Sequence, residues 1–217
     1  MSGQPRAVRL GGLISMLAPP LCWGCSGPAR SAEPLCAGCR SLLRPPTPDW
    51  VDLEGVPFWA ATTYEGPARA MVAALKFRGA TAVADAMAAR IAALADPCPR
   101  ASLVPVPLLP ARLQRRGYNQ AELLAAALGR RTRWSVDRCL VRSGGDERPQ
   151  MGRSRAERTA GPAGTIRIAD GRAAPEHALL VDDVATTGAT LRACAAALRE
   201  AGASAVRAVV FARTPGR

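Results

Sequence analysis

The fold of this 217-residue chain is decided by the stretch Ala178-Leu179-Leu180-Val181-Asp182-Asp183-Val184-Ala185-Thr186-Thr187-Gly188-Ala189-Thr190. A short apolar run, residues 178–181, predicts a buried strand, and two carboxylates follow at its end. A turn rich in threonine and glycine then leads into a helix predicted from Thr190 to Ala201. The stretch therefore predicts a strand–turn–helix unit of the kind that builds parallel sheets.

The residue types in this unit suit a sugar phosphate. A helix N-terminus presents unpaired N–H groups and the positive end of a dipole, both of which favour a phosphate. Gly188 lets the backbone approach closely, and the threonines within residues 186–190 add hydroxyl donors. Asp182 and Asp183 can accept hydrogen bonds from ribose hydroxyls or hold a divalent cation. We interpret the unit as a socket for ribose 5-phosphate; the alternative is an acidic turn that only caps the helix.

Strands and helices alternate along most of the chain. Strands are predicted at 58–64, 102–106, 178–181 and 205–211, and helices at 66–75, 81–94, 119–128 and 190–201. This alternation predicts an α/β fold with a doubly wound parallel sheet, in which ligands bind beyond the carboxyl ends of the strands. Residues 40–50 are rich in proline and predict a linker. Residues 142–164 show no apolar period and predict a flexible loop, either a functional lid or a disordered surface segment.

Four of the seven cysteines form two Cys-x-x-Cys pairs separated by ten residues. Two such pairs can converge on one tetrahedral ion, so we predict a structural zinc site. Two disulfides or a redox pair are the alternatives, and the odd number of cysteines argues against a disulfide framework. The predicted zinc ligands are Cys22, Cys25, Cys36 and Cys39. The other cysteines, predicted to be small buried groups, are Cys98, Cys139 and Cys194.

The composition indicates anionic partners. The formal net charge is +12, and such a surface attracts phosphorylated metabolites, nucleic acid or anionic lipid. Aromatic residues make up only 4% of the chain, so platforms for stacking bases are scarce. The apolar run at residues 10–21 is interrupted by glycine and proline, and no apolar stretch approaches 18 residues. We therefore predict an amphipathic N-terminal helix, no membrane span and a cytoplasmic location.

The motifs together resemble the ComF family, also called the competence protein F family, within the type I phosphoribosyltransferases. The stretch at residues 178–190 is similar to the phosphoribosyl-pyrophosphate signature of those enzymes. The resemblance covers nearly the whole chain. Besides the paired cysteines, it includes Tyr64-Glu65-Gly66, Leu75-Lys76-Phe77-Arg78-Gly79, Val104-Pro105-Val106-Pro107, Arg116-Gly117-Tyr118-Asn119-Gln120, Gln150 and Ser154-Arg155-Ala156-Glu157-Arg158.

The resemblance implies a Rossmann-like type I phosphoribosyltransferase fold at residues 51–217. Residues 1–50 are expected to hold an N-terminal helix, the four-cysteine zinc module and the linker. Asp182 and Asp183 are then expected to hold the ribose hydroxyls. A loop after Val106 is expected to bind pyrophosphate. The residues expected to contact phosphoribosyl pyrophosphate are Val184, Ala185, Thr186, Thr187, Gly188, Ala189, Thr190, Arg115, Arg116, Gly117 and Lys76.

Two of these expectations have a complication in the sequence. Lys76 is also placed to complement a helix dipole, as an alternative to contacting phosphate. The flexible loop is expected to close over pyrophosphate with Arg153 and Arg158 as catalytic residues, and closure would exclude water from the reacting centre. The family pattern has asparagine three residues after the second arginine, where this chain has Gly161.

Two functions are compatible with the sequence. The first is an enzyme in which phosphoribosyl pyrophosphate, bound with Mg²⁺, loses pyrophosphate and is attacked by a nitrogen nucleophile. The second is a non-catalytic factor that handles single-stranded DNA during uptake, with the competence machinery as partner. Between Arg100 and Arg158, thirteen arginines outnumber five acidic residues, which favours an anionic partner without naming one. A third, weaker alternative is a retired enzyme that only senses the metabolite.

Overall fold

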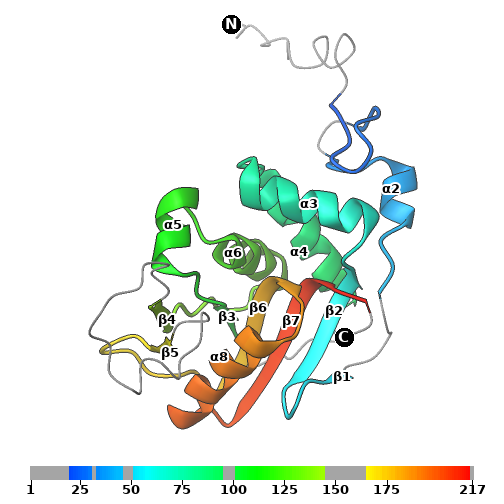
Figure 1. Cartoon of the computed structure of the whole chain (residues 1–217). Helices are drawn as coiled ribbons and strands as arrows, with labels where there is room; N and C mark the ends of the chain where they lie inside the picture. The colour runs from blue at the N-terminus through cyan, green and yellow to red at the C-terminus, as the bar shows by residue number, and fades with distance from the viewer. Residues whose placement is uncertain (1–19, 31–32, 46–50, 95–100, 145–164, 216–217) are drawn as a thin grey trace, which may run out of the picture.

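The computed structural model of the chain describes residues 20–30, 33–45, 51–94, 101–144 and 165–215. These residues form a five-stranded sheet flanked by helices, a two-stranded ribbon beside it, and a small N-terminal module (Figure 1). None of the helices in these ranges has the length and apolar composition needed to cross a membrane.

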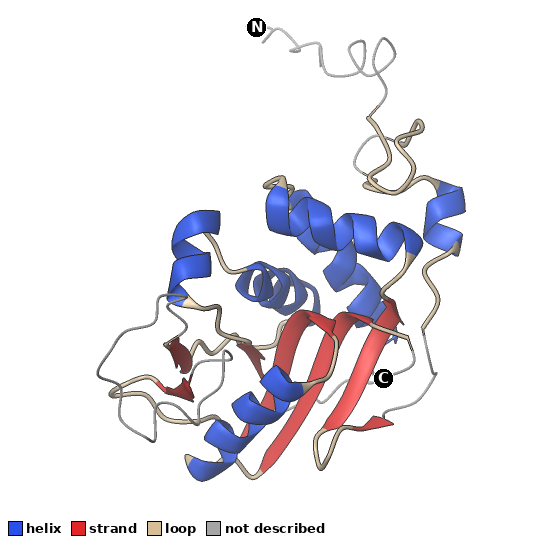
Figure 2. Cartoon of the chain, in the orientation of Figure 1, coloured by secondary structure: helices blue, strands red, loops and turns tan. Residues whose placement is uncertain are grey.

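The central sheet has the strand order β1-β2-β7-β6-β3. Its strands are β1 (Val51–Asp52), β2 (Pro57–Thr63), β3 (Ser102–Pro105), β6 (His177–Ala185) and β7 (Ala205–Arg213). All neighbouring pairs are parallel except β1 with β2. Parallel strands need crossover connections, which the helices provide (Figure 2). The strand ends that carry the predicted site therefore meet at one edge of the sheet.

Helices cover both faces of this sheet, which makes it doubly wound as predicted. One face carries α3 (Gly66–Phe77), α4 (Ala82–Leu94) and α6 (Gln120–Thr132), and the other carries α8 (Ala189–Glu200). Successive strand residues alternate between the two cores: Leu179 packs with the first group of helices and Leu180 with α8. A strand that is covered on both faces must be apolar on both faces. This burial explains why a continuous apolar run predicts β6.

Two of the sequence predictions that need correction concern β6 and the segment after Val106. The strand predicted to end at Val181 continues to Ala185, because β7 pairs with it through this region and Asp182 lies opposite Val210. The carboxylates therefore lie inside the strand and not beyond it. The loop predicted after Val106 is largely helical, since residues 110–116 form α5 (Pro110–Arg116).

The segments that flank the predicted flexible loop form a ribbon, β4 (Leu140–Ser143) paired with β5 (Thr165–Ile168). The predicted loop boundary at residue 142 is thus too early, because Arg142 pairs with Ile166 inside this ribbon. Most of that loop, with Arg153 and Arg158, lies outside the described residues.

The N-terminal module packs on the same side of the sheet as α3 and α4. Its helix is α2 (Ala37–Ser41), so the first residues of the predicted linker are helical. Of the apolar run at residues 10–21, for which a helix was predicted, the structure describes only residues 20 and 21, and these are not helical. Trp23 packs against the core, and the Arg78 guanidinium lies 5.9 Å from the centroid of its ring. A Cβ at Gly24 would lie 3.2 Å from the Cβ of Pro67. The module therefore contacts α3 near its beginning and just past its end.

Candidate functional site

Asp183 is a carboxylate buried inside β6, with 1% of its surface exposed. Its Oδ2 lies 2.7 Å from the Nζ of Lys76, in the last turn of α3. An isolated buried charge is strongly disfavoured, and this ion pair gives the buried Asp183 carboxylate a cationic partner. Lys76 thus contacts one of the two acids that the sequence singled out, and it joins α3 to the end of the sheet.

Asp182 is only partly buried and points to the other side of the strand from Asp183. Its Oδ1 accepts a hydrogen bond of 2.8 Å from the backbone N–H of Asp183. Burial raises the pKa of Asp182, and the neighbouring Asp183 carboxylate raises that pKa further. Ionised Asp182 is therefore best stabilised by an added cation or by hydroxyl donors.

The turn between β6 and α8 forms a small cleft of about 50 Å³. Gly188 has φ +73°, which favours glycine, and directly precedes the first helical residue, Ala189. Thr186 and Thr187 are exposed to solvent. The cleft is lined by Asp182, Val184, Ala185, Thr186, Thr187, Gly188, Ala189, Thr190 and Leu191. Apart from Leu191, this set contains only residues predicted from the sequence.

The tip of the β1–β2 hairpin packs against this turn, a contact that sequence reasoning missed. A Cβ at Gly188 would collide with the Cδ2 of Leu53 and lie 2.8 Å from its Cδ1. Arg192 donates a hydrogen bond of 3.0 Å to the carbonyl oxygen of Thr187 and pairs with Glu54 at 3.2 Å. The hairpin tip therefore holds the turn in place from a distant part of the sequence.

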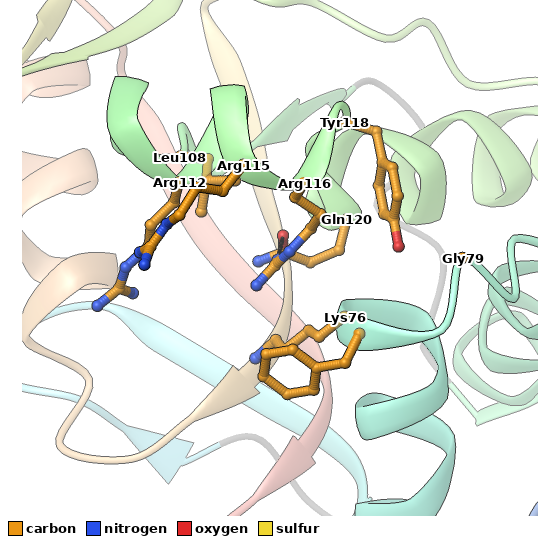
Figure 3. Close-up of a pocket in the computed structure, with 9 residues that line it drawn as sticks. Lys76, Gly79, Leu108, Arg112, Arg115, Arg116, Tyr118 and Gln120 are labelled. Carbon is orange, nitrogen blue, oxygen red and sulfur yellow. Dashed lines mark hydrogen bonds between the residues drawn. The ribbon is translucent and has the colours of Figure 1, made fainter.

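A larger cavity of about 680 Å³ lies between α3 and α5. Figure 3 shows Arg112, Arg115 and Arg116 extending from the α5 side, with Lys76 approaching from α3. Its lining residues are Lys76, Phe77, Gly79, Leu108, Arg112, Arg115, Arg116, Tyr118 and Gln120. Four of these are basic and none is acidic, so the cavity favours an anion.

Most of the predicted contact residues that the structure describes line either the small cleft or the larger cavity. Lys76, Arg115 and Arg116 line the larger one. Gly117 does not line it: with φ +79° it ends α5, and its N–H donates to the carbonyl oxygen of Leu113 at 2.7 Å. Sequence reasoning also missed Arg112, although its spacing from Arg115 and Arg116 is that of one helical face.

The four predicted zinc ligands converge. All four Sγ atoms lie within 4.8 Å of one another, and those of Cys25 and Cys36 are 3.8 Å apart. A tetrahedral ion with Zn–S bonds of about 2.3 Å requires sulfurs separated by roughly 3.8 Å, so this donor set fits zinc. Burial by itself would raise the pKa of Cys22, but backbone N–H groups, including that of Cys36 at 3.3 Å, lower the pKa to about 6. Burial and the neighbouring thiols raise the pKa of Cys39, so four thiolates at this spacing need a cation among them.

The isolated cysteines behave as predicted where the structure describes them. Cys139 and Cys194 are fully buried, and burial raises the pKa of both thiols, to about 11 for Cys139. Cys98 lies outside the described residues. These buried thiols are therefore poor nucleophiles and poor metal ligands.

The comparisons with known proteins fit this geometry. Residues 114–217 match the model of the phosphoribosyl transferase domain family. This match, together with the mostly parallel sheet, defines the chain as a protein of the type I phosphoribosyltransferase fold. The chain is 34% identical over 110 residues to competence protein ComFC of Streptococcus pneumoniae strain R6. It is a ComF-like, phosphoribosyltransferase-type protein, as its motifs predict.

The extent of these similarities is limited. The match to ComFC covers 51% of this chain and 47% of that protein, so the chain spans about half the length of this relative. Among solved structures, glutamine phosphoribosylpyrophosphate amidotransferase from B. subtilis is 20% identical, with 58% of this chain and 25% of that chain covered and a TM-score of 0.43. A structure from an analysis of an invariant aspartic acid in HPRTs, the asparagine mutant, is 16% identical, with 58% and 62% covered and a TM-score of 0.33.

Proposed function

We propose that this protein binds phosphoribosyl pyrophosphate together with Mg²⁺. The observation that carries the proposal is the continuity of β6: its two carboxylates lead directly into a phosphate-sized cleft at the start of α8. The cationic cavity adjoins the same acids through the ion pair of Lys76 with Asp183. A ligand with a phosphate, a diol and a pyrophosphate matches, in that order, the cleft, the two carboxylates and the cationic cavity.

Each part of the ligand has a proposed partner. The 5-phosphate accepts hydrogen bonds from N–H and hydroxyl groups of residues 186–190, where the helix dipole favours an anion. Asp182 and Asp183 accept hydrogen bonds from the two ribose hydroxyls. Arg115 and Arg116 neutralise the pyrophosphate. Mg²⁺, when bound, supplies further positive charge to the leaving group.

We further propose that the protein transfers the phosphoribosyl group to a nitrogen acceptor. The acceptor nitrogen forms a bond to the anomeric carbon while the bond to pyrophosphate breaks, and pyrophosphate departs with the electron pair. Among the described residues that line the large cavity, none is a carboxylate or a histidine that could serve as general base. The reaction therefore depends on stabilising the leaving group and on an acceptor that is already nucleophilic.

Calorimetric titration of the full-length, zinc-loaded chain with phosphoribosyl pyrophosphate and Mg²⁺ tests the proposal. We expect saturable binding by the wild type and its loss in Asp182→Asn/Asp183→Asn. The matched control is Asp85→Asn, which removes an exposed carboxylate on α4 that pairs with Arg130, and it should bind like the wild type. If folded wild-type protein shows no binding, the metabolite is the wrong ligand.

The alternative function, handling of single-stranded DNA during uptake, is supported by one observation, the cavity with four basic side chains and no acid. The similarity to competence protein ComFC also favours this alternative function. DNA held by its phosphates predicts an affinity that falls steeply with salt and that survives loss of Asp182 and Asp183. Titration of a single-stranded oligonucleotide at two salt concentrations with the double variant separates this function from the first.

We also propose that the four-cysteine cluster holds a structural zinc ion and that the protein works in the cytoplasm. Four protein ligands leave zinc no open position for a substrate, so its role is structural. The odd number of cysteines and their paired Cys-x-x-Cys spacing argue against a disulfide framework, which fits a reducing compartment.

A further inference from the structure

The four cysteines of the N-terminal module differ in their access to solvent. Cys22 and Cys39 are buried, at 1% and 7% exposure, and form an inner pair. Cys36 is half-buried and Cys25 is exposed, and these two form an outer pair. The outer pair takes one cysteine from each Cys-x-x-Cys motif, and its two Sγ atoms lie 3.8 Å apart. A reagent in solution therefore reaches the outer pair first.

The outer pair is suited to form a disulfide. Its sulfurs need to approach by roughly 1.8 Å to reach the disulfide distance of about 2.0 Å. The inner Cys22 is shielded, and its Sγ accepts hydrogen bonds of 3.3 Å from the backbone N–H groups of Gly24 and Cys36. Cys139 and Cys194 are fully buried in the sheet domain. Among the described cysteines, the outer pair is thus the one open to oxidation.

The first Cys-x-x-Cys motif also carries contacts between the module and α3. The two residues between its cysteines are Trp23 and Gly24. The ring centroid of Trp23 lies 5.9 Å from the guanidinium of Arg78, and a Cβ at Gly24 would lie 3.2 Å from the Cβ of Pro67. Cys25 follows directly, so a movement of its sulfur toward the second motif displaces the turn that packs on this helix.

Helix α3 connects this turn to the carboxylates of β6. Lys76 lies two residues before Arg78, and its Nζ is 2.7 Å from the Oδ2 of Asp183. Leu43 of the module belongs to the same buried cluster as Leu75 of α3. A four-cysteine module depends on its metal for folding, so loss of the metal removes this support from the helix.

We propose that Cys25 and Cys36 are a redox modification site, at which a peroxide forms a disulfide, the module releases its zinc ion and the carboxylates of β6 lose affinity for their ligand. The Cys25 thiolate attacks a peroxide oxygen, and the O–O bond breaks to give a sulfenic acid and hydroxide. The Cys36 thiolate then attacks the Cys25 sulfur and displaces a second hydroxide. The two thiolates lose two electrons, and hydrogen peroxide becomes two hydroxide ions that take protons from solvent. The remaining inner pair is too small a ligand set for a structural zinc site.

Titration of the reduced, zinc-loaded chain with hydrogen peroxide tests the modification. A chromogenic chelator reports released zinc, and mass spectrometry maps disulfides after the remaining thiols are alkylated. We expect one zinc ion released for each disulfide between Cys25 and Cys36, with reversal by a dithiol reductant and added zinc. Retention of zinc by the oxidised chain, or a first disulfide that contains Cys22 or Cys39, overturns the proposal.

Cys25→His is the matched variant, because three cysteines and a histidine also form a structural zinc site but the outer disulfide is impossible. We expect the variant to load zinc and to release it to peroxide at least about tenfold more slowly than the wild type, since the inner cysteines are buried. Cys36→His makes the same comparison from the second motif. Cys98→Ser is the control and should release zinc at the wild-type rate. Equal rates in wild type and in both zinc-loaded histidine variants would exclude the outer pair as the reactive site.

The effect on ligand binding rests on the proposed function and is measured separately. Calorimetry with phosphoribosyl pyrophosphate and Mg²⁺ compares the reduced chain, the oxidised chain freed of released zinc, and the chain after reduction and reloading. We expect oxidation to weaken binding about fivefold or more, the low end for two coupled sites, and reloading to restore it. Unchanged affinity, or loss of helix throughout the chain by circular dichroism, overturns the switch. If the reduced wild type does not bind the metabolite, the proposed function fails, whereas zinc release and the mapped disulfide still decide the modification.

Discussion

At the scale of single residues, the most consequential contact is the ion pair between Lys76 and Asp183. It joins residues that are far apart in the sequence, and it neutralises the carboxylate that lies deepest in the site. The lysine side chain is 23% exposed and the aspartate 2% exposed, so the pair is largely shielded from water. Removing one partner leaves the other as an uncompensated charge.

We expect Lys76→Met to lower the free energy of unfolding by about 3 kcal/mol, at the low end for a broken buried pair because the lysine is partly exposed. Lys76→Met/Asp183→Asn should recover most of that loss, since no buried charge remains. Urea denaturation measures both values. Arg130→Met breaks an exposed pair with Asp85 and should cost less than about 1 kcal/mol. Equal losses in Lys76→Met and Arg130→Met would show that the Lys76–Asp183 pair is worth no more than an exposed pair.

The raised pKa of Asp182 predicts that the stability of the protein depends on pH. Its pKa in the folded protein is raised above the unfolded value of about 3.9, mainly by burial and then by Asp183, so the folded state binds its proton more tightly. The contribution of Asp182 protonation to the free energy of unfolding is therefore present at acidic pH and is lost as the pH rises through the pKa in the folded protein. The backbone N–H of Asp183 and then the charge of Lys76 oppose the rise in the pKa of Asp182 without reversing it. Asp182→Asn should raise the melting temperature at pH 8, and this gain should shrink toward pH 4; a constant gain would contradict the shift.

At the scale of elements, local sequence patterns are sufficient to predict the main strands and helices and the doubly wound sheet. Strand β6 and helix α8 were evident because apolar runs and turn residues are local signals. Helix α5 was missed because its arginines and nearby prolines suggested a loop, although Pro110 at its start and Gly117 after its end mark a helix.

The remaining features of the site were not visible in the sequence because they depend on contacts between distant segments. The packing of Leu53 on Gly188 and the pairing of Lys76 with Asp183 follow from the topology of the sheet. The same holds for the extension of β6 past Val181, since β7 supplies its partner residues. Local periodicity carries no information about such pairings.

The packing of the β1–β2 hairpin on the turn between β6 and α8 leads to a prediction about stability. Gly188→Ala forces a side chain into φ +73°, at a cost of about 1–2 kcal/mol, and its Cβ also collides with Leu53. The double variant Leu53→Ala/Gly188→Ala removes the collision but keeps the backbone strain. Its free energy of unfolding, from urea denaturation, should therefore exceed the value expected if the two single changes were additive. Strict additivity would show that the hairpin does not pack on the turn.

At the scale of the whole molecule, the cysteine module and the sheet domain are connected through α3. The module contacts α3 beside Pro67 and at Arg78, and Lys76 near the end of the same helix reaches the acid pair. The carbonyl oxygen of Arg44 also accepts a hydrogen bond of 3.0 Å from the N–H of Thr63 at the end of β2. Metal binding at the module is therefore expected to stabilise the helix that bears the lysine.

Zinc removal tests this connection. Protein purified under reducing conditions should hold one zinc ion per chain by metal analysis, whereas Cys22→Ser and Cys36→Ser should hold none. Cys194→Ala, at a buried cysteine outside the cluster, should keep the ion. Since structural zinc contributes directly to folding, hydrogen exchange in the metal-free variants should accelerate in α3 and leave α8 unchanged. Acceleration of α8 by the same factor would indicate global destabilisation, and an unchanged α3 would show that the module folds independently of the site.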